Sequence, residues 1–456
     1  MYSAIDRAQP ALAFIPPDYS PLLRRAMRPL MPTWTAAKTN LAEVEARNVE
    51  TLAKLYHEFE AGKTRLILAF RHPSVSDPYV LSHLLWRDLP QKAREMGLSV
   101  GTTHAHFIYD RGIPLWAGSY LGWLFSKLGG VPIQRGKLDL QALKTARKLL
   151  LEGQFPLAAA PEGGTNGHNE IVSPLEPGVA QLAFWCAEDL RAQGRDDSVM
   201  ILPVGIQYRY VDEPWDALDR LIGQLEVDTG LAHSDKLERY GRLYRLAEHL
   251  LTLMEGYYEA FYGVRFESSE TAGASEMAAT PNEQLARRLR FLMDEALQVA
   301  ERHFGLRAKG EIIDRCRKVE QAGWDRIFRG ETQEYSPVAM GLANRIAEEA
   351  NLRMWHMRLV ESFVAVTGHY VKERPSADRF AETTLLLRDM VAKIKGEAAS
   401  YPQLGKQQAI VTVGEPMCVD ERLEAYRQKR RGAIAALTKD LQNNMKSLIF
   451  CSDTRS

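Results

Sequence analysis

The sequence predicts an α/β protein with a mostly parallel sheet flanked by helices and a large all-helical insertion before the last strand. Between residues 63 and 211, short continuous apolar runs alternate with amphipathic helical patterns. From about residue 235 to residue 397 the pattern is almost entirely helical, and an apolar run at residues 408–413 then restores the strand pattern. We therefore expect an N-terminal helical segment (1–62), an α/β core (63–211), a helical insertion (212–405) and a closing strand and helix of the core (406–456).

Composition limits the class of protein. The chain has 456 residues, 45% hydrophobic and 25% charged, which is ordinary for a folded protein. Lys plus Arg and Asp plus Glu both total 58, so bulk attraction to nucleic acid is not expected. The four cysteines lie far apart without a metal-binding or disulfide pattern, which favours a reducing compartment and predicts no metal.

The N-terminal region offers a candidate for membrane contact. No stretch approaches the roughly 18 apolar residues that span a bilayer, and residues 1–20 lack the apolar run of a cleaved targeting segment. Residues 21–34, PLLRRAMRPLMPTW, place Arg among apolar residues at near-helical spacing. The alternative is a helix packed on its own domain, and we expect Pro29 and Pro32 to interrupt it. The resulting expectation is a cytoplasmic protein, peripherally associated with membrane.

The elements follow in chain order. An apolar stripe over residues 41–61 predicts a helix that Gly62 ends, and the run LILAF at 66–70 predicts a buried strand. Asp77-Pro78 predicts a helix start with Asp77 as its N-cap, continuing to about residue 86. We expect further core strands at 99–103, 130–134, 156–160 and 200–208, and core helices at 115–128, 138–152 and 179–193. Later helices are expected at 235–262, 282–304, 308–328, 337–371, 377–396 and 422–446, with a strand at 408–413.

His72 and Asp77 are the main candidates for chemistry. They lie in RHPSVSD, residues 71–77, between an expected buried strand and an expected helix. The carboxyl end of a strand beside a helix start is where α/β folds place ligands. A histidine can act as general base near neutral pH, and a carboxylate on its other ring nitrogen fixes the tautomer. The alternative is that Asp77 only caps its helix.

Three further motifs follow in order. GGVPIQRG at 129–136 places Arg135 at the end of a short strand, PEGGTNG at 161–167 follows an apolar run, and ILPVGI at 201–206 is another buried strand. With the His72–Asp77 block, the sequence here resembles the glycerolipid acyltransferase superfamily, which includes lysophosphatidic acid and glycerol-3-phosphate acyltransferases. The resemblance covers about residues 64–210 and 408–417.

The resemblance implies an O-acyltransferase of phospholipid biosynthesis. It would move a fatty acyl group from acyl-CoA or acyl carrier protein to a hydroxyl of a glycerolipid-type acceptor such as lysophosphatidic acid, without another cofactor. His72 would take the hydroxyl proton and Asp77 would orient His72. Arg135 would bind an acceptor phosphate, a role suited to its planar guanidinium; the alternative is an ordinary surface Arg.

The acceptor site departs from the family pattern. The resemblance assigns Glu162, Gly163, Gly164 and Thr165 to the acceptor site, although these residues could also form a plain turn. Arg71 stands where the family usually has Asn, and the usual Arg after the Glu-Gly block is absent. Arg71 or Arg209 could replace that Arg in substrate binding, or the acceptor could carry no phosphate. Two alternatives therefore stay open, an acyltransferase for a non-phosphorylated lipid and a non-catalytic lipid-binding protein. The sequence leaves the oligomeric state open.

Overall fold

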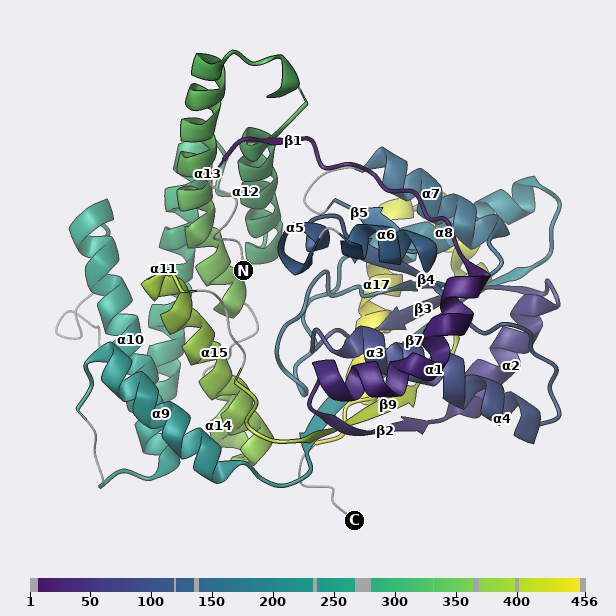
Figure 1. The fold of residues 1–456 in the computed structure, drawn as a ribbon, viewed down its shortest axis with the longest axis horizontal. Helices are drawn as coiled ribbons and strands as arrows, with labels where there is room; N and C mark the ends of the chain where they lie inside the picture. Colours follow the sequence, from purple (N-terminus) through teal and green to yellow (C-terminus); the bar gives the residue numbers. More distant parts are fainter. Residues whose placement is uncertain are drawn as a thin grey trace. The chain divides into compact units, whose positions relative to one another are not determined.

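The computed structural model describes residues 7–118, 120–134, 139–232, 236–266, 280–330, 332–363, 369–397 and 402–451. The chain forms two compact units (Figure 1). The α/β unit comprises Ala13–Asp212 and Lys406–Ser456, and the helical unit comprises Met1–Leu12 and Glu213–Gly405. The start of the chain thus joins the helical unit, where β1 (Gln9–Pro10) pairs with β8 (Phe328–Arg329).

The α/β unit is built on one mostly parallel sheet, as the sequence predicted. Its strands lie in the order β2 (Leu41–Arg47), β9 (Gln407–Val413), β7 (Ser198–Tyr210), β3 (Thr64–Phe70), β6 (Leu157–Ala159), β4 (His106–Asp110) and β5 (Val131–Ile133). Antiparallel pairing occurs where β9 and the short β10 (Met417–Cys418) meet β7. The predicted closing strand is β9, and its neighbours β2 and β7 come from far earlier in the chain.

The burial of strand β3 shows that helices cover both faces of the sheet. All seven of its residues are buried. Because side chains alternate along a strand, Leu66, Leu68 and Phe70 join one hydrophobic core, whereas Ile67 and Ala69 join another. The first core is covered by α1 (Pro21–Lys38), α2 (Val49–Glu60), α3 (Asp77–His83), the π-helical turn Leu84–Asp88 and α4 (Leu89–Glu95). The second is covered by α7 (Leu140–Glu152), α8 (Gly178–Ala192), α16 (Leu423–Gln428) and α17 (Arg430–Ser447).

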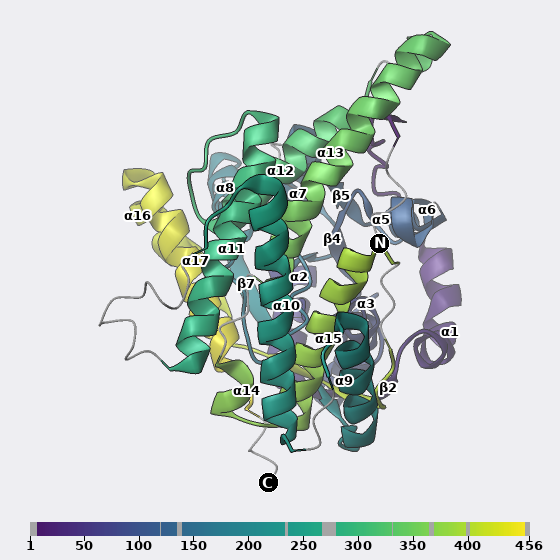
Figure 2. The ribbon, with the colours of Figure 1, turned by 90° about the vertical axis from the view of Figure 1, so that its left-hand side faces the viewer.

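The helical unit is built mainly of helices, most of them long, that pack along one another (Figure 2). They are α9 (Trp215–Thr229), α10 (Arg239–Tyr262), α11 (Pro281–Phe304), α12 (Ile312–Ile327), α13 (Pro337–Phe363), α14 (Tyr370–Glu373) and α15 (Ala377–Lys395). In the parts of both units that the structure describes, we find no helix with the length and apolar character needed to cross a membrane.

Several expected elements were wrong in type or extent. The helix expected at 41–61 is strand β2 followed by helix α2, separated by Asn48 at a φ of 58°. The strand expected at 99–103 does not form. Two carbonyl groups there accept hydrogen bonds from side chains instead of from a neighbouring strand. The Arg24 guanidinium donates to the Thr103 carbonyl, and the Tyr56 hydroxyl donates to the Thr102 carbonyl. Contacts made elsewhere in the chain thus override the local pattern.

Other corrections concern where helices break. Helix α1 continues through Pro29 and Pro32, which we expected to interrupt it; Arg24 and Met27 anchor it in the interior. The helix expected at 115–128 is α5 (Ile113–Ala117) and α6 (Tyr120–Lys127), with Gly118 between them at a φ of 115°. The helices expected at 337–371 and 422–446 are each two helices, and α9 was not expected at all.

Candidate active site

The candidate site lies at the carboxyl end of β3. The Arg71 N–H donates to the carbonyl of Val204, which extends the pairing with β7 by one residue, and His72 follows. Strand β6 pairs with β3 in parallel, so the loop after β6, which carries Glu162, emerges at the same edge of the sheet. Parallel strands bring their carboxyl ends together, and this is where α/β folds hold ligands.

His72 and Asp77, which the sequence singled out, are hydrogen-bonded to each other. His72 Nδ1 lies 2.7 Å from Asp77 Oδ2, and the backbone N–H of Ser74 donates to the same oxygen at 3.2 Å. The His72 side chain is 25% exposed, whereas that of Asp77 is fully buried. A proton on Nδ1 bonds the carboxylate and leaves Nε2 with the lone pair that a general base requires.

Asp77 is held in an apolar setting by several donors. Burial raises the pKa of the Asp77 carboxyl, and hydrogen bonds from His72, Tyr208 and Ser74 act in the opposite direction. The Tyr208 hydroxyl donates to Oδ1, and burial, followed by the Asp77 charge, raises the Tyr208 pKa, so the phenol stays protonated. Asp77 was expected to cap α3, but Ser76 occupies the N-cap position and the Asp77 carboxylate contacts His72 instead.

Glu162 supports the site through the backbone. Its Oε1 accepts the N–H of His72 at 3.0 Å, and its Oε2 accepts from Asn166 and from the N–H of Ser173, both at 2.9 Å. The Glu162 side chain is fully buried, so its carboxylate joins His72 to the loop after β6.

The glycines and Thr165 lie in that loop. Gly163 has a φ of 72°, and a Cβ atom there would lie 2.2 Å from Glu176 Oε1, so the turn requires glycine at this position. Gly164 is half-buried and Thr165 is exposed. The loop therefore combines a tightly built start with an accessible end.

Arg71 and Arg209 both make contacts with the protein itself. Arg71 is fully buried; Nη1 donates to the Asn169 carbonyl at 2.6 Å, and Nη2 donates to the carbonyls of Ile171 at 2.6 Å and His168 at 3.1 Å. Its Nε lies 3.5 Å from Glu162 Oε1. Arg209 pairs with Glu170 at 2.8 Å and also bonds the Phe450 carbonyl. Arg135, the expected phosphate ligand, lies outside the described residues.

Sequence reasoning missed Tyr208, which follows Asp77 by 131 residues in the chain. A signal was present, because the apolar block at 201–206 continues along β7. Alternate residues Val204, Ile206 and Tyr208 share one face and one core. A tyrosine at the end of such a face has a hydroxyl that needs a partner in the interior, but the pattern does not say which partner.

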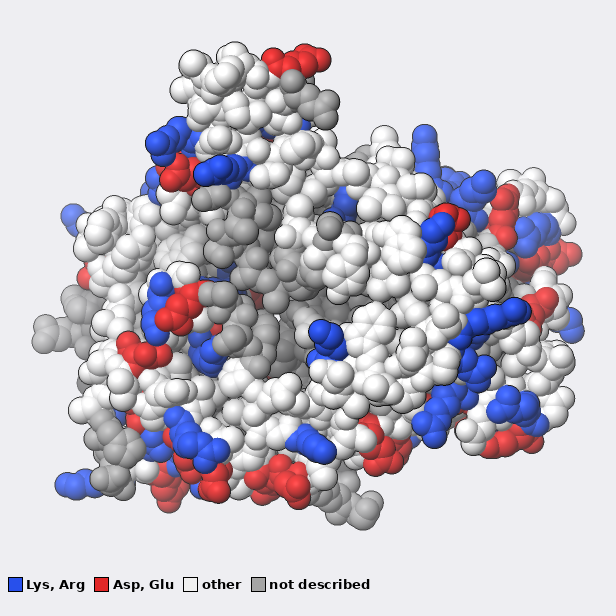
Figure 3. Space-filling model, viewed as in Figure 1, with Lys and Arg blue, Asp and Glu red and all other residues white. Residues whose placement is uncertain are grey.

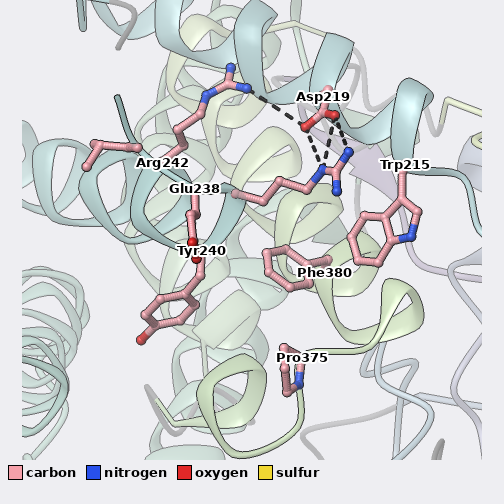
Figure 4. Close-up of a pocket in the computed structure, with 9 residues that line it drawn as sticks. Trp215, Asp219, Glu238, Tyr240, Arg242, Pro375 and Phe380 are labelled. Atoms are coloured by element: carbon pink, nitrogen blue, oxygen red, sulfur yellow. Dashed lines mark hydrogen bonds and ion pairs between the residues drawn. The ribbon is translucent and has the colours of Figure 1, made fainter. Parts of the chain in front are cut away.

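A separate open hollow of about 650 Å³ lies in the helical unit (Figure 4). Arg239 stacks over Trp215 at 4.7 Å and pairs with Asp219 at 2.9 Å, and Arg242 pairs with Glu226 at 2.8 Å. These charged groups satisfy one another. Over the described part of the chain, we also find no group of three His, Cys, Asp or Glu side chains placed to hold a metal ion.

One comparison with known proteins finds a match, and it falls in the α/β unit. Residues 43–207 match the family model described as Acyltransferase. The chain matches none of the curated proteins and none of the solved structures with which it was compared. The matched segment contains His72, Asp77 and Glu162, and it ends one residue before Tyr208.

Proposed function

We propose that the protein transfers a fatty acyl group from an acyl thioester to a lipid hydroxyl with His72 as general base, because residues 43–207 match the Acyltransferase family model. Acyl transfer on a lipid is the activity that the family match supports. The donor, the acceptor and the roles of individual residues are our proposal.

One observation carries the mechanism, the bond between partly exposed His72 and buried Asp77. The acceptor hydroxyl gives its proton to His72 Nε2 as its oxygen attacks the thioester carbonyl. The resulting tetrahedral intermediate breaks its C–S bond, and the thiolate takes the proton from His72. No acyl-enzyme forms, and general-base catalysis of this kind is typically worth about 10²–10⁴-fold in rate.

For substrates, we propose acyl-CoA or acyl carrier protein as donor and a glycerolipid such as lysophosphatidic acid as acceptor. Arg135 would bind the acceptor phosphate, and Gly163, Gly164 and Thr165 would line the acceptor site. Glu162 already bonds the His72 backbone, so we assign it a supporting role there. With these substrates the protein would act in phospholipid biosynthesis.

We also propose peripheral attachment to a membrane from the cytoplasmic side. Helix α1 exposes Leu22 and Leu30 beside exposed Arg25 and Arg28, and α6 exposes Trp123. Figure 3 supports this choice, because the surface over α1, α5 and α6 is largely uncharged with Lys and Arg at its margin. Apolar side chains bordered by cations suit an anionic lipid surface.

A second candidate function is acylation of a non-phosphorylated lipid. It is favoured by Arg71 and Arg209, which were the possible replacements for the missing family Arg. Both guanidinium groups bond carbonyl or carboxylate groups of the protein itself. Arg135 is then the one remaining candidate among the three arginines for binding a phosphate. An acceptor that carries only hydroxyl groups would need no phosphate ligand.

The deciding experiment incubates purified protein with labelled acyl-CoA or acyl carrier protein and either lysophosphatidic acid or monoacylglycerol, and identifies the product by mass spectrometry. We expect product from lysophosphatidic acid, whereas faster transfer to monoacylglycerol would favour the second candidate. His72→Ala should lower the rate by about 10²–10⁴-fold.

The matched control is His57→Ala. His57 lies in the same unit, but its ring hydrogen-bonds the Ser99 carbonyl and not Asp77. Transfer should be unchanged in this variant. An unchanged rate in His72→Ala would overturn the mechanism, and lipid binding without turnover in the native protein would support a non-catalytic lipid-binding protein.

A further inference from the structure

We propose that Tyr208 is a positioning residue for acyl transfer, acting on Asp77 and through it on His72. The inference rests on the proposed function, since it assigns a third member to the same catalytic group. Tyr208 would not touch the substrates. Its hydroxyl would fix the carboxylate that orients the general base.

The first support is that the two oxygens of the Asp77 carboxylate accept hydrogen bonds from different donors. His72 Nδ1 and the Ser74 N–H both meet Oδ2, and the Tyr208 hydroxyl meets Oδ1. With a donor on each oxygen, rotation of the carboxylate would break at least one hydrogen bond. Without the hydroxyl, Oδ1 would be buried without this donor, a costly state for a charged group.

The second support is the rigidity of Tyr208 itself. It lies on β7, which pairs with β3 on one side and β9 on the other, and it is 3% exposed. Its backbone N–H donates to Asn169 Oδ1 at 2.7 Å, and the Asn169 carbonyl accepts from buried Arg71 at 2.6 Å. A donor held by a central strand can position a partner more accurately than one on a loop.

The electrostatic consequence has a definite sign. The titratable groups that face Asp77 through hydrogen bonds are His72 and Tyr208, with the Ser74 N–H as a neutral donor. The phenol stabilises the ionised carboxylate. Its removal raises the pKa of the Asp77 carboxyl further, so activity that needs the ionised carboxylate begins at higher pH.

The test is Tyr208→Phe in the full-length protein, assayed with labelled acyl-CoA and the acceptor that the native enzyme prefers. We expect kcat to fall about tenfold with KM values nearly unchanged, and the acidic limb of the kcat/KM profile to move up by about one pH unit. A residue with only a structural role would lower the folded fraction without moving the pH profile.

Tyr56→Phe is the matched control, because it removes another buried hydroxyl of the same unit, one that bonds the carbonyls of Thr102 and His104. It should change the midpoint of thermal unfolding but leave the pH profile in place. A Tyr208→Phe profile that coincides with that of Tyr56→Phe would overturn the inference, and an inactive native enzyme would instead overturn the proposed function.

Two further variants guard against misfolding. In an Asp77→Asn background, Tyr208→Phe should cost little additional activity, because the partner it acts through is already altered. Replacement of Tyr208 by a fluorinated tyrosine, which keeps the shape and makes a stronger donor, should move the acidic limb to lower pH. A full additional loss in the first variant, or an unmoved limb in the second, would contradict the role.

Discussion

Buried polar groups are organised differently in the two units. Around the candidate site of the α/β unit they form one connected network, in which Tyr208 and His72 both bond Asp77, Glu162 bonds the His72 backbone, and Arg71 binds the loop after β6. All of these contacts surround one partly exposed imidazole at the carboxyl end of β3.

In the helical unit several buried polar groups join pairs of neighbouring helices. Arg242 on α10 binds Glu226 on α9, Arg288 on α11 binds Glu255 on α10, and Arg315 on α12 binds Glu301 on α11. The His356 ring on α13 lies between the hydroxyls of Tyr258 and Tyr262 on α10. Each of these groups joins two helices.

The difference separates two uses of a buried polar group. Desolvation makes any such group costly, so it contributes through the geometry that it specifies. Separate pairs specify which helices lie side by side. A network that converges on one side chain specifies the orientation of that side chain. We therefore expect substitutions in the network to change turnover, and substitutions in the pairs to change only stability.

The largest expected effect is in Asp77→Asn. We expect acyl transfer to fall by about 10⁴-fold, since an amide cannot stabilise the imidazolium. Burial raises the Asp77 pKa, so the folded state disfavours the charge at neutral pH and removing it should leave the free energy of unfolding equal or higher. Steady-state kinetics and chemical denaturation check both parts. Activity within tenfold of the native value would remove Asp77 from the mechanism.

Next in size is Arg71→Met. The change leaves the Glu162 carboxylate without its buried cation and leaves three carbonyls without their donor. We expect a loss of about 3–5 kcal/mol in the free energy of unfolding, together with lower kcat in the protein that remains folded. Urea denaturation and active-site-normalised rates measure the two effects. Normal turnover per folded molecule would mean that the network does not position His72.

Arg315→Met is the counterpart in the helical unit. Arg315 binds both oxygens of Glu301, at 2.8 and 2.9 Å, and both side chains are less than a tenth exposed. We expect a similar loss of about 3–5 kcal/mol with unchanged kcat and KM per folded molecule. If turnover fell as much as in Arg71→Met, the proposed distinction between the two units would fail.

Acid should weaken both units by the same mechanism. Burial lowers the pKa of His104 in the α/β unit to about 3 and that of His356 in the helical unit to about 4, from an ordinary 6.5. Below pH 6.5 the unfolded chain takes up protons that the folded chain refuses. Each histidine therefore costs roughly 2 kcal/mol of stability between pH 6.5 and pH 5.

Denaturation at pH 7 and pH 5 measures this loss. Gln at this position can still hydrogen-bond the tyrosine hydroxyls but does not titrate. His356→Gln should therefore reduce the difference in unfolding free energy between pH 7 and pH 5 by the contribution of one histidine. An acid sensitivity equal to that of the native protein would show that His356 is not responsible.

The smallest effect is expected for Arg239→Met at the hollow in Figure 4. The Arg239–Asp219 pair is exposed, with about 45% and 34% of the two side chains accessible. We expect a change below about 1 kcal/mol that shrinks further in high salt, measured by urea denaturation at two salt concentrations. A larger loss would mean that this surface pair stabilises the fold as much as the buried pairs do.

Much of the fold could be predicted from local patterns. Apolar runs such as residues 66–70 and 201–206 identified central strands because a strand buried on both faces needs a continuous apolar run. Elements at the edge of the sheet were harder to predict. Residues 41–47 suggested a helix but form strand β2, because β9, more than 360 residues later, offers a parallel edge that a local pattern does not reveal.

The sequence alone determined the α/β architecture, the helical insertion and the pairing of His72 with Asp77, because each depends on neighbours in the chain. The tertiary structure decided that Tyr208 meets the other oxygen of Asp77 and that Arg71 is buried against carbonyls. These outcomes depend on which strands lie side by side, since strand order brings together residues 131 and 98 positions apart. A hydrogen bond needs proximity in space, and chain spacing limits that only over short separations.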